Sequence, residues 1–288
     1  MERTVKNYFS VAILAIIWGS SFILMKKGLE VFNYMQVANA RIFIAFITLI
    51  PLLPKALKSV KRRHFFPILI TALLGNGIPA ILFAKAQTYL DSSFVGILNS
   101  SVPLFTIIIG FLFFKIKPNN ANIIGVLVGL LGVLFLTINS INTKIMLDTY
   151  VFIVILATIF YAVSMNVIKN YLQDFNASSI TAIAFLIIGP FSFVYLSNTD
   201  FLYQLNSHPS AYKALGYIAL LSIFGTSMAS IIFNKLLNRS TAIFTSSITY
   251  LIPIVAIFWG FLDGEIITIN HIVGFIIILC GVYLVNRE

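Results

Sequence analysis

The sequence predicts an all-α membrane protein with ten transmembrane helices, arranged as two inverted five-helix repeats around a central cavity. Three observations lead to this fold class: an unusually apolar composition, a series of long apolar runs, and a similarity between the two halves of the chain. Of the 288 residues, 59% are hydrophobic and only 10% are charged, against about 25% charged in soluble domains. So few charges exclude a soluble globule of this size, and the single Cys excludes a disulfide scaffold.

The apolar runs are long enough to cross a bilayer. A helix needs about 20 mostly apolar residues to span the hydrocarbon core. Ten such runs are present, at 8–25, 35–53, 66–86, 92–114, 121–139, 150–168, 178–197, 214–233, 242–262 and 271–286. They are continuously apolar, whereas an outer-membrane barrel shows alternating segments of about 10 residues. The connections are short, so we expect no separate soluble domain.

The charges predict the orientation of these helices. If the N-terminus is cytoplasmic, most of the 19 Lys and Arg residues fall in cytoplasmic segments and most of the nine acids fall outside. The positive-inside rule then places both termini in the cytoplasm. We expect a multi-pass protein of the plasma (inner) membrane. The basic cluster at 55–63 is interpreted as a topology signal rather than a nucleic-acid patch, so the expected partners are the lipid bilayer and a small molecule, without nucleic acid.

The two halves of the chain match in an ordered series. Offsets of 150, 149, 143 and 139 align Gly75 with Gly225, Phe83 with Phe233, Pro103 with Pro253, Gly132 with Gly281, Trp18 with Tyr161, Ser21 with Ser164, and Pro51 with Pro190. This predicts two repeats, at 1–140 and 149–288. Five helices per repeat means that the second copy enters the membrane from the opposite side. Inverted repeats around a midplane site are typical of alternating-access transporters.

Several segments carry a resemblance to a known family. They are Trp18 to Ser21, Arg41, the stretch from Ala86 to Pro103, the stretch from Ile243 to Pro253, Gly260 to Glu265, and Gly274 to Gly281. With them the chain resembles EamA-type members of the drug/metabolite transporter superfamily. The resemblance implies ten helices, a central substrate cavity and movement of small metabolites, often amino acids and commonly outward. The family usually has Glu just after the fourth span, where this chain has about Lys115, whereas the second copy keeps Glu265.

The third span contains the first group of candidate site residues. Its middle includes Gly75, Asn76, Gly77 and Pro79, which loosen the helix and release backbone groups. Interrupted helices near the midplane indicate a transport site, so Asn76 is a candidate substrate ligand. The glycines and Pro79 are candidate hinges, as is Gly225 beside the candidate ligand Thr226 in the matching span. The alternative interpretation is a kink that serves packing alone.

The fourth and ninth spans each contain a proline near the middle. Pro103 and Pro253 remove a backbone hydrogen bond and are candidate hinges. Three polar side chains that precede these prolines are candidate substrate ligands, namely Asn99, Ser100 and Tyr250. The alternative is that these side chains only bridge neighbouring helices.

Two aromatic residues occupy matching central positions of the first and sixth spans. Trp18 and Tyr161 lie away from the interfaces where aromatic belts form. They are candidates for stacking on an organic ring or for a cation–π contact, with core packing as the alternative. Ser21 and Ser164, which follow them, are weaker candidates because Ser often bonds to its own helix.

Three cations are not explained by the loops. Lys85 and Lys235 end the middle span of each half, and Arg41 lies inside the second span. They are candidate gates that contact a substrate carboxylate. The alternative for the two lysines is snorkelling to the headgroups, whereas Arg41 should face protein or water because its burial in lipid costs roughly 2.5–3.5 kcal/mol.

The motifs that are missing also constrain function. The sequence has no ligand spacing for a metal, no phosphate-binding loop and no nucleophile elbow. We therefore expect no metal, no cofactor and no enzyme activity. The predicted function is secondary transport of small organic metabolites, most plausibly export of amino acids or related amines. The alternative is a flippase for lipid or polyprenyl-linked headgroups. Small residues at four-residue spacing leave monomer and homodimer open.

Overall fold

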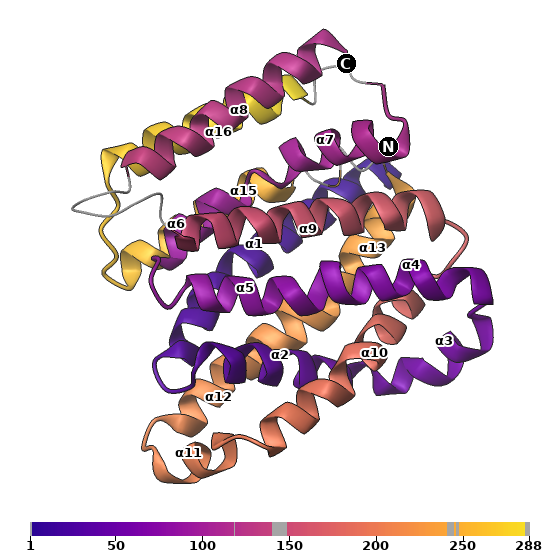
Figure 1. Cartoon of the computed structure of the whole chain (residues 1–288), viewed down its shortest axis with the longest axis vertical. Coiled ribbons are helices and arrows are strands. Elements are labelled where there is room, and N and C mark those ends of the chain that lie inside the picture. The colour runs from indigo at the N-terminus through magenta and orange to yellow at the C-terminus, as the bar shows by residue number, and fades with distance from the viewer. Residues whose placement is uncertain (1, 118, 140–148, 241–244, 246–247, 286–288) are drawn as a thin grey trace.

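The computed structural model describes residues 2–117, 119–139, 149–240, 245 and 248–285 (Figure 1). All regular elements in these residues are helical. The first half contains α1 (Glu2–Leu29), α2 (Tyr34–Leu49), η1 (Ile50–Leu52), α3 (Leu53–Ser59), α4 (Arg62–Ala72), η2 (Leu73–Gly77), α5 (Ile78–Ala86), α6 (Ser92–Asn99), α7 (Val102–Phe114) and α8 (Asn120–Asn139).

The second half has a similar order of elements. It contains α9 (Thr149–Tyr171), α10 (Ala177–Ser197), α11 (Phe201–Ser207), α12 (Ala211–Leu220), η3 (Leu221–Met228), α13 (Ala229–Arg239), α15 (Ile248–Leu262) and α16 (Ile269–Val285). The short helix α11 lies in the connection between the spans formed by α10 and α12. It has no counterpart among the apolar runs of the sequence.

Seven helical stretches in the described part of the chain are long and apolar enough to cross a membrane. Three shorter apolar helices, at 120–135, 251–262 and 269–284, fall within or beside the remaining predicted runs. The all-helical architecture and the apolar spans agree with the prediction from composition. The protein is therefore a multi-pass helical membrane protein.

Several spans are interrupted where the sequence has Gly or Pro. The third span changes from α4 to the π-helix η2 and then to α5, and the eighth changes from α12 to the π-helix η3 and then to α13. The fourth span breaks between α6 and α7, and Pro103 is the second residue of the new helix. Proline fits the first turn of a helix because its missing N–H has no partner there in any case. Pro253, in contrast, lies inside α15.

The two halves pack against each other through matching pairs of helices. α1 of the first half packs on α15 of the second, and α9 of the second half packs on α7 of the first. α2 packs on α10, and α8 packs on α16. Figure 1 shows α8 and α16 side by side at one edge of the molecule. Of these four contacts, the first two are exchanged counterparts of each other, and the last two each join equivalent helices of the two halves.

Glycines permit the close approach of α8 and α16. A Cβ at Gly132 would lie 2.9 Å from both the backbone nitrogen and a side-chain carbon of Ile278, and a Cβ at Gly281 would meet the backbone of Gly129. The sequence offset of 149 relates these two contacts to each other. This is the helix packing that the small-residue spacing predicts.

Candidate functional site

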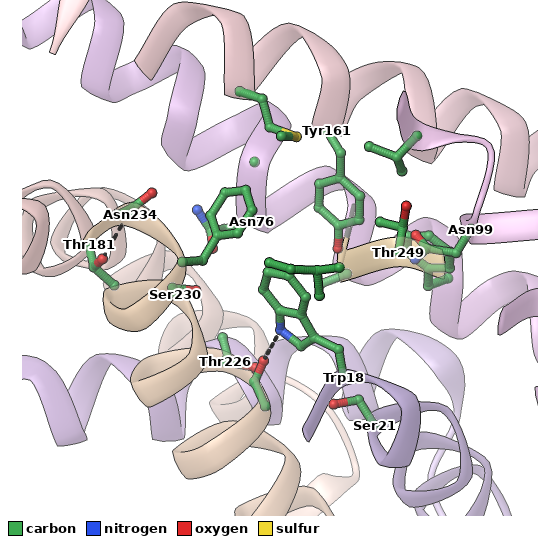
Figure 2. A pocket seen from close by; sticks show the side chains of 18 of the residues that line it. Trp18, Ser21, Asn76, Asn99, Tyr161, Thr181, Thr226, Ser230, Asn234 and Thr249 are labelled. Atoms are coloured by element: carbon green, nitrogen blue, oxygen red, sulfur yellow. Dashed lines mark hydrogen bonds between the residues drawn. The ribbon is translucent and has the colours of Figure 1, made fainter. Parts of the chain in front are cut away.

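A cavity of ≈ 140 Å³ lies between the helices of the two halves (Figure 2). Its polar lining comes mainly from hydroxyl, amide, indole and phenol groups. The labelled side chains in Figure 2 are Trp18, Ser21, Asn76, Asn99, Tyr161, Thr181, Thr226, Ser230, Asn234 and Thr249. An engineered cavity of about 150 Å³ in another protein holds benzene, so this cavity has room for a small organic group.

Most of the lining consists of residues that the repeat offsets relate in pairs. The pairs in the lining are Trp18 and Tyr161, Phe22 and Met165, Met25 and Ile168, Ile42 and Thr181, Gly75 and Gly225, Asn76 and Thr226, Ala80 and Ser230, Phe83 and Phe233, Asn99 and Thr249, and Val102 and Ile252. The two sequence copies thus contribute equivalent positions to one shared cavity.

The two π-helices present their polar residues to this cavity in the same way. Asn76 Nδ2 donates to the carbonyl of Thr71 at 3.0 Å, and Thr226 Oγ1 donates to the carbonyl of Leu221 at 3.2 Å. Each bond spans five residues and satisfies a carbonyl within the widened turn. Single π-helical turns inside α-helices are frequent at functional sites. The interruption predicted for the third span is present as η2, and the matching eighth span contains the π-helix η3.

The central aromatic residues occupy the cavity wall. The ring of Trp18 lies 5.2 Å from that of Phe233, and the ring of Tyr161 lies 5.6 Å from that of Phe83. Trp18 Nε1 also donates to the carbonyl of Gly225 at 3.0 Å. Both residues line the cavity, and this hydrogen bond fixes the orientation of the indole.

The remaining predicted ligands have different positions. Ser21 and Asn99 line the cavity, and Ser21 Oγ bonds to the carbonyl of Ile17. Ser100 is fully buried and donates to the carbonyl of Ile97, and it does not line the cavity. Ser164 also lies outside the lining, where it packs against Gly75. The side chain of Tyr250 lies outside the described residues.

The predicted hinge residues divide in a similar way. Gly75 and Gly225 belong to the cavity lining, whereas Gly77, Pro79, Pro103 and Pro253 do not. Gly77 and Pro79 lie at the junction of η2 and α5. Both residues lie where a π-helix changes to an α-helix. Their role as hinges stays a prediction.

The three unexplained cations have three different environments. Arg41 lines the cavity, and its Nε donates to Thr226 Oγ1 at 2.7 Å. Lys85 Nζ lies 5.9 Å from the centre of the Tyr34 ring and outside the lining. Lys235 is exposed. Of the three, the structure places only Arg41 at the cavity.

The sequence interpretation did not single out several polar lining residues. Thr181, Ser230 and Asn234 line one end of the cavity, where Asn234 Nδ2 donates to Thr181 Oγ1 at 3.0 Å (Figure 2). Asn234 is 5% exposed. A signal was available, because Asn234 and Ser230 correspond at offset 150 to Ala84 and Ala80. A polar residue that replaces an apolar one in only one copy indicates a specific role.

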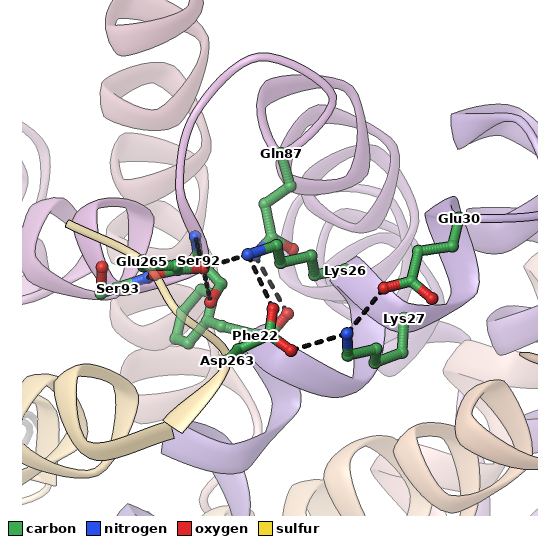
Figure 3. Close-up of polar contacts among 9 residues, drawn as sticks. All are labelled: Phe22, Lys26, Lys27, Glu30, Gln87, Ser92, Ser93, Asp263 and Glu265. Carbon is green, nitrogen blue, oxygen red and sulfur yellow. Dashed lines mark hydrogen bonds and ion pairs between the residues drawn. The ribbon is translucent and has the colours of Figure 1, made fainter. Parts of the chain in front are cut away.

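An ionic cluster joins α1 to the connection between α15 and α16 (Figure 3). Lys26 Nζ lies 2.8 Å from both Asp263 Oδ2 and Glu265 Oε1, and Lys27 Nζ lies 2.6 Å from Asp263 Oδ1. Lys27 also pairs with Glu30 at 2.7 Å. Asp263 and Glu265 lie more than 200 residues from these lysines along the chain, so no local sequence pattern links them.

Glu265 is the buried member of this ionic cluster. Its side chain is 1% exposed, and its carboxylate accepts from the backbone N–H groups of Ser92 and Ser93, at 2.9 Å each, and from Ser92 Oγ at 2.6 Å. Burial alone would raise the pKa of Glu265, but the hydrogen bonds from Lys26, Ser92 and Ser93 hold that pKa below its ordinary value. The carboxylate also caps the N-terminus of α6, where negative charge is favoured.

The first half has no acid at the corresponding position. Glu265 N–H donates to the carbonyl of Gly260 at 2.9 Å, and Ile116 N–H donates to the carbonyl of Gly110 at 3.1 Å. A Cβ on Gly260 would meet Glu265, and one on Gly110 would meet Ile116. The structural counterpart of Glu265 is therefore Ile116, one residue beyond the position expected from sequence. Lys115 itself is exposed and has φ of 58° at the end of α7.

A second hollow of ≈ 520 Å³ lies between α1, α12, η3 and α15. Its lining is mainly apolar, with Ser20, Lys27 and Asp263 as the principal polar side chains. This groove and the central cavity share Gly225 in their linings. Neither Arg41 nor Lys85 lines the groove. Its basic side chain, Lys27, is paired with Asp263 at 2.6 Å.

The fold and cavity together define a multi-pass membrane protein with two related halves around a small polar site. Residues 5–138 and 148–287 each match the EamA-like transporter family. The chain therefore belongs to this family, which occurs here in two copies. Family membership and the names of its relatives indicate a membrane transporter, a class that is generally not enzymatic.

Several curated proteins are similar over nearly the whole chain. "Uncharacterized transporter YoaV" of Bacillus subtilis is 25% identical, covering 97% of this chain and 96% of its own length. An "uncharacterized transporter" of Archaeoglobus fulgidus is 21% identical, with 98% and 99% covered. "Uncharacterized inner membrane transporter YedA" of Escherichia coli is 26% identical, with 88% and 81% covered. A solved crystal structure aligns with a TM-score of 0.66 at 13% identity, covering 97% of this chain and 96% of its own, which supports the fold alone.

Proposed function

We propose that this protein is a secondary transporter that moves small organic metabolites, amino acids or related amines, by alternating access of two inverted repeats. The observation that carries the proposal is the central cavity, most of whose lining comes in pairs from the two copies. An alternating-access site must be reachable from either side of the membrane in turn. Equivalent walls from two inverted copies supply that property.

The packing of the helices supports inversion of the second copy. The contact of α1 with α15 corresponds to the contact of α9 with α7, and α2 with α10 and α8 with α16 join equivalent elements. A pseudo-twofold axis in the membrane plane produces this pattern, because it places each helix of one half where its counterpart lies in the other half. Both termini in the cytoplasm and export as the direction of flux are part of this proposal.

Movement between the two states would use the interrupted spans. The π-helices η2 and η3 and the break between α6 and α7 lie at the cavity. Local changes in helical hydrogen bonding there require fewer broken contacts than bending a continuous helix. No Asp or Glu belongs to the cavity lining among the described residues, which favours facilitated movement or exchange over a carboxylate proton relay.

The experiment is counterflow in proteoliposomes that contain the purified protein. Vesicles preloaded with one metabolite should accumulate the labelled form of the same metabolite, and the thermal unfolding midpoint in detergent should rise with that compound. Empty vesicles and vesicles with heat-denatured protein are the controls. If no solute from a broad metabolite panel moves or stabilises the protein, the proposal is wrong.

The alternative function is a lipid or polyprenyl-linked headgroup flippase. It requires a side opening between helices that joins the bilayer to the basic residues of the site. The groove beside α1 meets the cavity at Gly225 but does not include Arg41. Scrambling of fluorescent lipids by the reconstituted protein, in the absence of solute flux, would select this alternative.

A further inference from the structure

The charge of the central cavity is strongly asymmetric. Arg41 is a cation in the lining, and no carboxylate from the described residues lines the cavity. Within the described residues, the ion pairs lie elsewhere, in the ionic cluster around Glu265 and in the contacts of Asp174 with Arg63 and His64. The guanidinium of Arg41 therefore has no carboxylate partner in this part of the chain. An uncompensated cation inside a membrane protein is costly and marks a functional site.

The guanidinium is held in place at one of its donors. Arg41 Nε donates to Thr226 Oγ1 at 2.7 Å, while the Thr226 hydroxyl itself donates to the carbonyl of Leu221. The threonine proton is committed to the carbonyl, so its oxygen is presented to Arg41 as an acceptor. This arrangement orients the planar group and leaves the terminal nitrogens for other partners.

Arg41 belongs to the minority of lining residues whose counterpart in the other copy does not line the cavity, as do Ser21 and Asn234. At offset 139 its counterpart in the second copy is Ile180, which is fully buried and does not line the cavity. Paired residues are suited to building two equivalent walls. Arg41 has no such equivalent, and among the unpaired lining residues it is the one that supplies a positive charge.

We propose that Arg41 binds a carboxylate of the transported substrate, so that the substrate class is small organic acids and amino acids rather than simple amines. The inference rests on the proposed transport function. A carboxylate matches the two-pronged donor geometry of a guanidinium. Its single negative charge also balances the single positive charge of Arg41, whereas a phosphate group carries about −1.5 to −2 at neutral pH and would leave excess charge in a small cavity.

An amine without a carboxylate is disfavoured by the same charges. It would place a second cation in a cavity that already holds Arg41, with no acid in the described lining to pair with either. The ammonium group of an amino acid is different, because its own carboxylate occupies Arg41. That ammonium group can then lie against the rings of Trp18 or Tyr161 through a cation–π contact.

The test uses matched compounds that share one side chain. Each triad contains an amino acid, the acid that lacks its amino group, and the amine that lacks its carboxyl group. The triads are leucine, 4-methylpentanoate and 3-methylbutylamine; phenylalanine, 3-phenylpropanoate and phenethylamine; and valine, 3-methylbutanoate and isobutylamine. Thermal shift and counterflow of the full-length wild-type protein are measured for each compound. We expect the carboxylate-bearing members of at least one triad to stabilise the protein and to move, and the amines to do neither.

Variants then locate the effect. Arg41→Gln should weaken the response to carboxylates by on the order of 100-fold, because a buried charge pair loses one partner, and Arg41→Lys should retain part of it. Arg62→Gln is the matched control, since Arg62 is exposed at the start of α4, and it should leave the response unchanged. If Arg41→Gln does not fold, the wild-type triads still decide.

The outcomes separate the two proposals. Amines that bind and move as well as their amino acids, or an unchanged carboxylate response in folded Arg41→Gln, overturn the role of Arg41 and leave the transporter standing. If no member of any triad and no solute of the broader panel binds or moves, the transport function fails, and the substrate class fails with it.

Discussion

The backbone of Gly225 in η3 lies directly against the side chain of Ser21 in α1, so that a Cβ at position 225 would be 2.5 Å from Ser21 Oγ. The same relationship joins Gly75 in η2 to Ser164 in α9. The offsets 150 and 143 convert one contact into the other. Two helix crossings in opposite halves of the molecule are thus built from the same pair of residue types.

This contact predicts the effect of adding one methyl group. Gly225→Ala should lower stability by about 1–3 kcal/mol, the usual range for overpacking, and the double variant Gly225→Ala/Ser21→Ala should recover part of the loss. The measurement is the thermal unfolding midpoint in detergent. Gly216→Ala is the control, because nothing lies within 4 Å of its Cβ, and alanine there should be neutral or slightly stabilising. Equal midpoints for the two alanine variants would contradict the packing argument.

The buried ion pair predicts a difference between two acids. Glu265→Gln removes one of the two carboxylate partners of Lys26, the one in a nearly inaccessible position, and breaking a buried pair costs about 3–5 kcal/mol. Lys26 is 29% exposed at its side chain, which reduces the expected loss to about 1–3 kcal/mol. Glu30→Gln is the matched control, because Glu30 is 55% exposed and such pairs contribute at most about 1 kcal/mol. A smaller midpoint shift for Glu265→Gln than for Glu30→Gln would refute this ranking.

The same carboxylates predict acid sensitivity. Burial would raise the pKa of Asp263, but hydrogen bonds from Lys26 and Lys27 hold it below its ordinary value, as for Glu265. In the unfolded chain the pKa is about 3.9 for Asp and about 4.3 for Glu. Because the folded pKa of Asp263 and Glu265 is lower, these groups stabilise the protein fully above the unfolded pKa. This stability is lost as the pH falls through the folded pKa. Midpoints measured from pH 7 to pH 3 should therefore fall on the acid side.

The double variant Glu265→Gln/Asp263→Asn tests that assignment. Its midpoint should depend less on pH than that of the wild type over the same range. The comparison is needed because burial and the nearby Glu265 raise the pKa of Asp91, which gives a contribution of opposite sign. Parallel pH curves for the two proteins would show that other groups dominate the acid response.

The orientation of the central indole predicts a loss of transport. Trp18→Phe keeps an aromatic ring but removes the hydrogen bond to the carbonyl of Gly225. One such bond is worth about 0.5–1.5 kcal/mol, so the counterflow rate should fall by roughly two- to tenfold. Trp259→Phe is the control. Trp259 donates a hydrogen bond to Ser20 and lines the groove between α1, α12, η3 and α15 rather than the central cavity. Equal rates in the two variants would assign Trp18 to packing alone.

The π-helical amide predicts a further loss. Asn76→Ala leaves the carbonyl of Thr71 without its side-chain donor and removes an amide from the cavity. Transport should fall by about tenfold, in proportion to one polar contact, while the protein remains folded. Asn198→Ala removes a similar bond to the carbonyl of Val194 at an exposed helix end and should retain normal flux. A wild-type rate in Asn76→Ala would place the amide outside the transport path.

Much of the fold was predictable because apolar runs and helix breakers act locally. In the part of the chain that the structure describes, seven of the ten runs correspond to helices long enough to cross a membrane, and the Gly and Pro residues at 75–79 and 103 lie at interruptions of two of these helices. The site was less predictable, because spacing shows which residues share a depth but does not fix how far each helix is rotated. Ser164 illustrates this limit: it matches Ser21 in sequence, yet it faces Gly75 and not the cavity.

Long-range partners were also beyond sequence reasoning. Glu265 was visible in the sequence as the acid that the second copy keeps, but nothing local links it to Lys26, 239 residues away. The pairing of Arg41 with Thr226 has the same character. Each of these contacts depends on which helices of the two halves become neighbours, which only the assembled fold determines.

The second half has Glu265 where the first half has Ile116, and this difference makes the two ends of the molecule chemically unequal. At one end Lys26 is held by carboxylates, whereas its counterpart Lys169 donates to the carbonyls of Leu237 and Ser240 at 3.1 and 2.6 Å. Salt screens the exposed pair of the ionic cluster, Lys27 with Glu30, far more than it affects bonds to neutral carbonyls. Ionic strength should therefore loosen one end selectively, and the rates of inward and outward passage should respond to it to different extents.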